Sequence, residues 1–401
     1  MANDQQAASA DVSGQPMTCA QREQRSGSSA FALMYPPKIL FGPGRLEELG
    51  EEAARFGTRA VVVCGRTAMR KQGILDRALR VLRDSGIACT DFQEVEADPS
   101  LATVTGGVRR VSEFRGDLVI GLGGGSAIDA GKAIASMVRQ PQSVYAYFDG
   151  AEIELPGLPF IAIPTTAGTG AEVTSNAVLT DERCQRKRSL RSPLMTPGTA
   201  IVDPELTRSM SPYLTACTGM DALVQAIEAF VTSTPNPVSD VLSSRAIVLI
   251  TEALPGAVQE GDDAEARVQM ALGSLLSGMA FSTSGLGAVH GLAHPIGARF
   301  GAPHGHICAI LLPAVMRFNL PARRDRFGEI AGLIGLGSAE ALIQRIEELL
   351  GEVGLLMDLK AWGITQDDLP AIVAESRSGS MGKNPRQASD EELVGLLMEL
   401  T

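Results

Sequence analysis

The sequence predicts an N-terminal α/β domain built on a parallel sheet, followed by an all-helical C-terminal domain. Up to about residue 200, short and unbroken apolar runs alternate with helical patterns, which is typical of parallel strands with helices on both faces. Beyond about Leu206, helical periodicity dominates and strand patterns are nearly absent. We therefore divide the 401 residues into a tail over 1–30, an α/β domain over 31–205 and a helical domain over 206–401.

The predicted elements follow one another in a regular order. Strands are expected at 59–65, 87–95, 117–125 and 159–166, and helices at 73–86, 100–114 and 126–138. In the second half, helices are expected at 219–231, 241–254, 265–281, 324–335 and 338–354. The last segment, 377–401, reads as a loop before a short helix, and the polar tail over 1–30 lacks the basic and apolar regions of a signal peptide.

Composition excludes several classes of function. The net charge of −11 argues against nucleic acid or an anionic membrane as a partner, because both require a basic face. No run of eighteen apolar residues is present, so we expect no membrane span. Six scattered cysteines without a C-x-x-C motif fit reduced thiols in a cytoplasmic protein, where they would serve mostly as small apolar fillers.

A glycine-rich turn joins the strand at 117–125 to the helix after it. Its residues Gly121, Gly123, Gly124 and Gly125 allow a ligand to approach the backbone, and Ser126 opens a helix whose N–H groups suit a phosphate. An ordinary tight turn between strand and helix would explain the same glycines. A second polar turn over 164–181 carries Thr165, Thr166, Thr169 and Asn176, also at the carboxyl end of a strand. Together the two turns favour a bound nucleotide.

All four histidines lie within seventeen residues: His290, His294, His304 and His306. His290 and His294 would share one face of a helix, unless Pro295 kinks or ends it. Such a cluster indicates a metal site, since neutral imidazole is the commonest protein ligand.

An anionic ligand is available in the segment 219–231. Asp221 and Gln225 face the same way on the expected helix, and Glu228 is expected elsewhere on the wheel. Asp221 would equally suit a helix N-terminus as a dipole partner.

Four ordered motifs resemble those of the iron-dependent (group III) alcohol dehydrogenase family, over about residues 31–395. They are "GGGSAIDAGKAIA", "PTTAGTGAEVTSNAVLTD", "GMDALVQAIEAF" and "HGLAHPIGARFGAPHGHICAILLP". The resemblance implies the two-domain architecture shared with dehydroquinate synthase, with a dinucleotide-binding domain over 31–205, a metal and substrate domain over 206–401, and an active site between them. It implies pyrophosphate binding by Gly123, Gly124, Gly125 and Ser126. It also places Asp129, Thr165, Thr166, Thr169, Asn176 and Lys187 around the cofactor, assigns Asp221, His290 and His304 as metal ligands, and sets His294 beside the nicotinamide.

The chain departs from the family where Gln225 stands in place of a usual histidine ligand. Gln225 could coordinate through its amide oxygen, which is a weaker ligand for a transition metal than imidazole. His306 could substitute for the missing ring, or the site could work without metal. We expect altered but retained binding of one divalent ion, Fe or Zn, by Asp221, Gln225, His290 and His304.

The expected activity is reversible hydride transfer between NAD(P)H and a small aldehyde or ketone, with His294 as proton relay. At the end of the strand 59–65, Gly65 is followed by Arg66 rather than a carboxylate, which favours NADP over NAD. The alternatives are a maleylacetate-reductase-like enzyme, a dehydroquinate-synthase-like lyase, a metal-independent reductase and a non-catalytic relative. The family also suggests a homodimer or larger homo-oligomer. The sequence does not identify the substrate.

Overall fold

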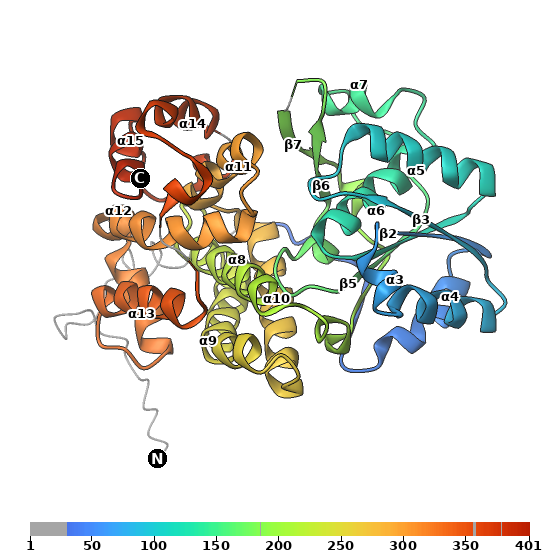
Figure 1. Ribbon diagram of the computed structural model, residues 1–401, viewed down its shortest axis with the longest axis horizontal. Coiled ribbons are helices and arrows are strands. Elements are labelled where there is room, and N and C mark those ends of the chain that lie inside the picture. Colours follow the sequence, from blue (N-terminus) through green and yellow to red (C-terminus); the bar gives the residue numbers. More distant parts are fainter. Residues whose placement is uncertain (1–29, 185, 356–357, 378) are drawn as a thin grey trace, which may run out of the picture.

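The computed structural model describes residues 30–401 apart from 185, 356, 357 and 378. The tail predicted over 1–30 lies outside the described residues except for Ala30. Figure 1 shows two halves side by side: an α/β half, coloured blue to green, and a helical half, coloured yellow-green to red. The two halves agree with the fold class that the sequence predicts.

Six parallel strands form one sheet in the order β1-β8-β5-β4-β2-β3. Their bounds are β1 Lys38–Phe41, β2 Arg59–Gly65, β3 Ala88–Val95, β4 Leu118–Gly123, β5 Phe160–Pro164 and β8 Thr199–Val202. The four strands expected from apolar runs, β2 to β5, are confirmed. Strands β1 and β8 were not predicted, because each has only four residues, too few to show a pattern.

Helices cover both faces of this sheet (Figure 1). They are α2 Leu49–Ala54, α3 Ala68–Lys71, α4 Ile74–Asp84, α5 Leu101–Phe114, α6 Gly125–Met137 and α7 Val144–Phe148. Alternate residues of β2 point to opposite faces of the sheet and pack in different hydrophobic cores. Val61 and Val63 pack in the core with residues of α5 and α6, whereas Ala60 and Val62 pack in the core with residues of α2 and α4. This division is the reason the strand is apolar throughout.

An antiparallel hairpin, β6 Asn176–Asp181 and β7 Arg186–Arg191, follows β5. This corrects the expectation that 164–181 is one polar turn, because Asn176 already begins a strand. The hairpin was hard to predict because β7 reads RKRSLR, which lacks the apolar alternation of an ordinary strand. Only one face of the hairpin, with Ala177, Leu179 and Leu190, enters the core of the α/β half.

The second half is helical, as predicted. Its helices are α8 Pro212–Val231, α9 Pro237–Gln259, α10 Ala264–Ser284, α11 Ala288–Phe300, α12 His304–Leu333, α13 Ala339–Glu352, α14 Leu369–Glu375 and α15 Asp390–Met398. Pro295 lies inside α11 without ending it, so His290 and His294 are on one helix. The short helix expected near the carboxyl end is α15.

Three of these helices, α8, α9 and α12, are long and apolar enough to cross a membrane by length and composition alone. Their apolar residues contribute to one core shared by the helical half. In α8, 89% of the apolar window is buried inside the protein. The corresponding windows of α9 and α12 are 56% and 67% buried. Burial within the helical half accounts for the composition of α8, because a helix that is apolar all round needs partners on every side.

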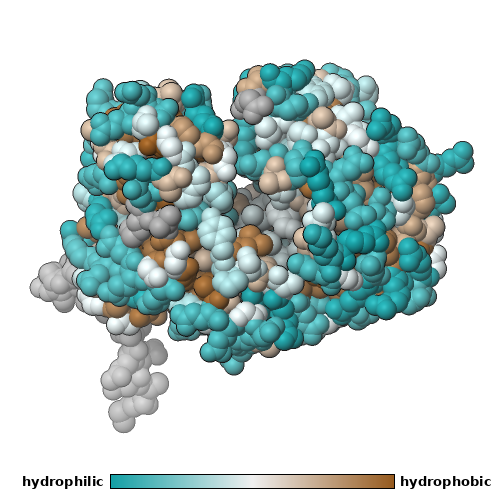
Figure 2. Space-filling view, viewed as in Figure 1, coloured by the Kyte–Doolittle hydropathy of each residue, from teal (hydrophilic) through white to brown (hydrophobic). Residues whose placement is uncertain are grey.

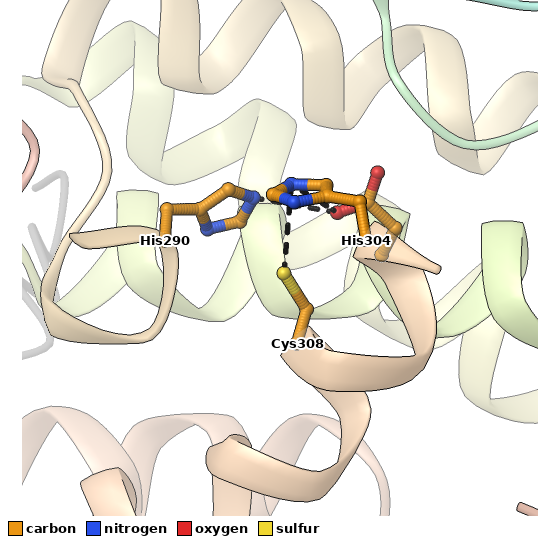
Figure 3. A group of neighbouring side chains, drawn as sticks. His290, His304 and Cys308 are labelled. Carbon is orange, nitrogen blue, oxygen red and sulfur yellow. Dashed lines mark hydrogen bonds and ion pairs between the residues drawn. The ribbon is translucent and has the colours of Figure 1, made fainter. Parts of the chain in front are cut away.

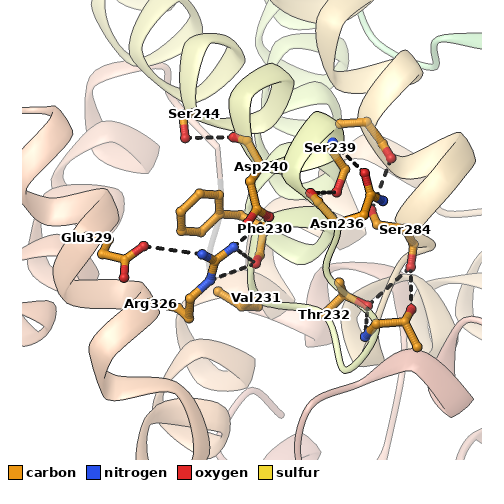
Figure 4. A network of polar contacts seen from close by, with 12 residues as sticks. Phe230, Val231, Thr232, Asn236, Ser239, Asp240, Ser244, Ser284, Arg326 and Glu329 are labelled. Carbon is orange, nitrogen blue, oxygen red and sulfur yellow. Dashed lines mark hydrogen bonds and ion pairs between the residues drawn. The ribbon is translucent and has the colours of Figure 1, made fainter. Parts of the chain in front are cut away.

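A polar network joins α8, α9 and α12 (Figure 4). Arg326 on α12 donates to the Phe230 carbonyl oxygen at 2.8 Å and to Asp240 Oδ1 at 2.6 Å. Its guanidinium carbon also lies 3.7 Å from the centre of the Phe230 ring. The side chain is 16% exposed, so these bonds are partly shielded from water. They fix the end of α8, the helix that carries Asp221.

We expect Arg326→Met to lower the free energy of unfolding by about 2 to 3 kcal/mol, because a charged donor is lost while its acceptors stay partly buried. Urea unfolding followed by circular dichroism measures this change. Arg324→Met is the control, because Arg324 pairs with Glu340 at a side chain that is 62% exposed, and its loss should cost less than about 1 kcal/mol. Equal losses in the two variants would contradict this account of the network.

Candidate active site and metal centre

The candidate site lies between the two halves, where the space-filling view shows the surface hollowed (Figure 2). The strands β4 and β5 end at Gly123 and Pro164. The hairpin strand β7 contacts α11, the helix that carries His290 and His294. Predicted cofactor residues from the first half and predicted metal ligands from the second half therefore meet in one region.

The glycine turn between β4 and α6 packs closely on the turn after β5. A Cβ atom on Gly125 would lie 2.7 Å from Cγ2 of Thr169, and one on Gly123, whose φ is +148°, would lie 2.8 Å from Cβ of Ala127. The backbone N–H of Thr165 donates to the Gly123 carbonyl oxygen at 2.9 Å. Larger residues would force the two turns apart.

The amino end of α6 is arranged to receive an anion. Gly124 is the N-cap residue and supplies no side-chain acceptor to the helix, and Ser126 lies in the first turn. The first N–H groups of a helix lack partners within it and attract negative charge. Thr166 lies against Gly124, where a Cβ atom would be 3.4 Å from its Cγ2. Gly65 ends β2, the strand next to β4, so it lies at the same edge of the sheet.

Asp129 is engaged with the protein itself. Its Oδ2 accepts from the Val178 N–H at 2.9 Å, and its Oδ1 lies 3.2 Å from Nζ of the buried Lys132. Lys132 also donates to the carbonyl oxygen of Ala171 at 2.9 Å. Burial raises the pKa of Asp129, and the charge of Lys132 opposes that rise. The bond from Val178 ties α6 to the hairpin, and the bond to Ala171 ties α6 to the segment before it, so Asp129 positions the hairpin beside the glycine turn.

The outer face of the hairpin carries Asn176 and Lys187. The amide nitrogen of Asn176 donates to Oγ of Ser189 at 2.9 Å, and Nζ of Lys187 lies 2.6 Å from Oδ1 of Asp98. The positive charge of Lys187 lowers the pKa values of His294 and His304, in addition to the larger lowering caused by burial. The structure therefore brings Lys187 within electrostatic reach of the histidines.

A group of four possible metal ligands lies in the helical half (Figure 3). Asp221, His290, His304 and Cys308 each offer one atom, and these atoms all lie within 4.8 Å of one another. Oδ1 of Asp221 is 3.3 Å from Nε2 of His290 and 3.9 Å from Nε2 of His304. Sγ of Cys308 is 3.6 Å from the same His304 nitrogen.

Cys308 was not among the ligands predicted from the sequence, which treated the cysteines as apolar fillers. It stands four residues after His304 on α12, so one face of that helix carries both side chains. The same i, i+4 spacing that singled out His290 and His294 could have found it.

Gln225 is the remaining predicted ligand, one turn after Asp221 on α8. Its Oε1 is buried and makes no hydrogen bond in the described part of the chain, and the same holds for Oδ1 of Asp221 and Nε2 of His290. Burying such atoms without partners costs free energy. A cation bound among them would satisfy all three, so the residues present fit a divalent metal ion.

Glu228 has a role that the sequence analysis missed. It was expected elsewhere on the helix wheel, yet seven residues are two turns, so Glu228 lies on the Asp221 side of α8. Its Oε1 accepts from the Val289 N–H at 2.7 Å, and its Oε2 lies 2.7 Å from Nδ1 of His290. A carboxylate on Nδ1 directs Nε2 of the ring toward the metal position, as is usual for histidine ligands.

Close packing brings α12 against α8. A Cβ atom on Gly305 would lie 2.2 Å from the Cys217 carbonyl oxygen, so only glycine lets His304 reach Asp221.

His306 does not join the cluster. Its Nδ1 lies 2.9 Å from the hydroxyl of Tyr213, and its ring packs edge-on against Trp362. The suggestion that His306 substitutes for the missing ligand is therefore wrong, because two residues along a helix point to different sides.

His294 stacks against His304, with ring centres 5.3 Å apart. Burial, together with smaller contributions from the positive charges of His290, Lys187 and Arg191, lowers the pKa of His294 to about 3. His294 is neutral near pH 7 and is not one of the four grouped donors. It lies at the border between the donor cluster and the hairpin.

Comparison with known proteins agrees with this geometry. Residues 36–204 match the family model described as iron-containing alcohol dehydrogenase, and residues 215–401 match that of the family's C-terminal domain. An NADPH-dependent butanol dehydrogenase from Clostridium saccharobutylicum is 38% identical over 375 residues, which cover 89% of this chain and 95% of the relative.

Two solved structures are also similar to this chain in sequence and in fold. A 1,3-propanediol oxidoreductase superposes with a TM-score of 0.90 and 34% identity, covering 93% of this chain and all of the other. A sulfoacetaldehyde reductase from Bifidobacterium kashiwanohense, solved with NAD⁺, has a TM-score of 0.87 and 32% identity over 93% and 99% of the two chains. The chain belongs to the iron-containing alcohol dehydrogenase family, whose members are oxidoreductases that use a nicotinamide cofactor and a metal ion.

Proposed function

We propose that this dehydrogenase interconverts a small aldehyde or ketone and the corresponding alcohol in the hollow between its two halves. When bound, the nicotinamide supplies a hydride to the carbonyl carbon and the metal ion polarises the carbonyl oxygen. The observation that carries the proposal is a set of buried donor atoms that make no hydrogen bond in the described part of the chain: Asp221 Oδ1, Gln225 Oε1 and His290 Nε2. The other half supplies a glycine turn that suits a dinucleotide phosphate.

The ligand set proposed for the metal is Asp221, His290 and His304, completed by Gln225 or Cys308. Gln225 offers an amide oxygen in place of the usual imidazole, which weakens the site for a transition metal. Cys308 offers a sulfur atom 3.6 Å from Nε2 of His304, and a thiolate is a strong ligand for zinc and iron. We propose that Cys308 compensates for the histidine that Gln225 replaces.

Cobalt substitution tests this ligand. The protein loaded with Co²⁺ should show a thiolate-to-cobalt charge-transfer band in the near ultraviolet, and Cys308→Ala should abolish it and weaken metal affinity by about 10-fold or more. Cys217→Ala is the control, because Cys217 is also buried but is not among the grouped donors. A spectrum unchanged by Cys308→Ala would leave Gln225 as the proposed fourth ligand.

His294 is the proposed proton relay. Its neutral ring lies beside His304 but outside the donor group, so a ring nitrogen is free to exchange a proton with the substrate oxygen through water or the cofactor ribose. His290 lies one turn before His294 on α11, and Glu228 orients its ring for metal binding. The two histidines of α11 therefore have separate roles.

His294→Ala should lower kcat by about 100-fold or more while metal content per chain stays near the wild-type value. His290→Ala should lose both metal and activity, because it removes a ligand. Steady-state kinetics and elemental analysis of the same preparations measure the two quantities. Parallel loss of metal and turnover in His294→Ala would make His294 a ligand instead.

Cofactor choice is proposed to favour NADP. Arg66 follows Gly65 at the end of β2, is exposed, and is held by a hydrogen bond from its Nε to the Glu94 carbonyl oxygen at 3.4 Å. Its guanidinium is a candidate partner for the 2′-phosphate, since the position carries no repelling carboxylate.

Arg66→Gln should lower kcat/KM for NADPH by about 10-fold, the value of one charge-assisted hydrogen bond, and leave kcat/KM for NADH nearly unchanged. Arg109→Gln serves as the control, because it removes the same charge from a side chain on α5 that is 78% exposed and has no proposed role at the cofactor. A wild-type enzyme that prefers NADH, with Arg66→Gln changing both cofactors equally, would contradict the proposal.

A further inference from the structure

The outward face of the β6–β7 hairpin carries an arginine, Arg191, that the reaction described above does not use. The opposite face, with Ala177, Leu179 and Leu190, is buried in the core. Side chains alternate along a strand, so Lys187, Ser189 and Arg191 of β7 share the outward face. Arg191 pairs in register with Asn176 across the hairpin, at the end of β7.

This outward face is turned toward the histidine cluster. The strand β7 contacts α11, and Figure 1 shows the hairpin across the gap from that helix. The positive charges of Lys187 and Arg191 both act on the ring of His294, lowering its pKa in addition to the effect of burial. The guanidinium of Arg191 therefore lies within electrostatic reach of the place where the carbonyl group reacts.

Lys187 and Arg191 differ in what they contact. Lys187 is paired with Asp98 at 2.6 Å and is only 10% exposed. The guanidinium of Arg191 makes no hydrogen bond, ion pair or ring contact with the described residues, although the protein around it lowers its pKa by burial. The side chain of Arg191 is nevertheless exposed at the surface of the hairpin. An arginine without a carboxylate partner presents a planar fork of donors that matches an oxyanion.

We propose that Arg191 binds a carboxylate at the far end of the substrate, so that the enzyme prefers aldehydes carrying an acid group over neutral aldehydes of the same length. This inference rests on the proposed function and specifies its substrate class. Binding holds the aldehyde end toward His294 and the metal ligands, with the acid end at the hairpin. In the reverse direction the substrates are the corresponding hydroxy acids.

A second arginine on the same strand, Arg188, is the matched control. Arg188 and Arg191 both border a surface hollow of about 470 Å³ between residues 147–153 and β7. Arg188 lies on the opposite face of the strand, where its guanidinium carbon is 5.9 Å from the centre of the Phe148 ring. If the substrate carboxylate binds beside the metal ligands, only Arg191 should contribute. If it binds in the surface hollow, both Arg188 and Arg191 should contribute.

The test compares neutral and acidic aldehydes of equal chain length: butanal with succinic semialdehyde, and pentanal with 5-oxopentanoate. Wild-type enzyme should reduce the acidic member of at least one pair with a higher kcat/KM. Arg191→Gln should lower that value by about 10-fold or more, mainly through KM, and change the value for the neutral aldehyde by less than about 3-fold. Arg188→Gln should leave the preference intact.

Three outcomes would overturn the inference. One is reduction of neutral aldehydes without any preference for the acids, which leaves the proposed function standing. Another is a higher KM for NAD(P)H in Arg191→Gln with every aldehyde, which would make Arg191 a cofactor contact. The third is equal loss of preference in Arg188→Gln. Failure to reduce any aldehyde, neutral or acidic, would instead refute the proposed function.

Discussion

Two carboxylates, Asp221 and Glu228, are buried on one side of α8, 3% and 5% exposed, with His290 between them. Neither pairs with a lysine or an arginine in the described part of the chain. Buried carboxylates need a cation or several donors, and here one imidazole serves both. Glu228 takes the Nδ1 side of the ring, so Asp221 faces the Nε2 side, where further donor atoms converge. One imidazole can balance at most one of the two negative charges, and the rest of the site depends on the charge that remains.

Packing of the helical half directs the other donors to the same place. Gly305 lets the start of α12 touch α8, and the first turn of α12 presents His304 and Cys308 together. The hairpin closes the other side of the hollow. Asp129 of α6 holds the hairpin through the Val178 N–H, and Lys132, which pairs with Asp129, holds the segment just before the hairpin through the Ala171 carbonyl oxygen. These contacts hold the glycine turn and the hairpin, which contacts α11, in a fixed arrangement beside the metal ligands.

The sequence predicted the fold class, most central strands, the glycine turn and the cluster of histidines, because each leaves a local periodic or compositional signal. It missed features that depend on residues distant in the chain. Glu228 and Cys308 stand at ordinary helical spacings from Asp221 and His304, but their roles follow from how α11 and α12 pack on α8. The hairpin strand β7 is charged and half-exposed, so no apolar pattern marks it. His306, which looks like part of the cluster in sequence, is turned away by the helix on which it lies.

The geometry favours a catalytic metal ion held by the buried donors around Asp221, despite the presence of Gln225. Elemental analysis of the purified protein, before and after chelation, tests it most directly when NADPH-dependent aldehyde reduction is assayed on the same samples. We expect one Fe or Zn per chain, with activity lost when the metal is removed and recovered when it is returned. Full activity in protein free of metal would contradict it and would indicate that the cluster works through proton transfer and substrate binding alone.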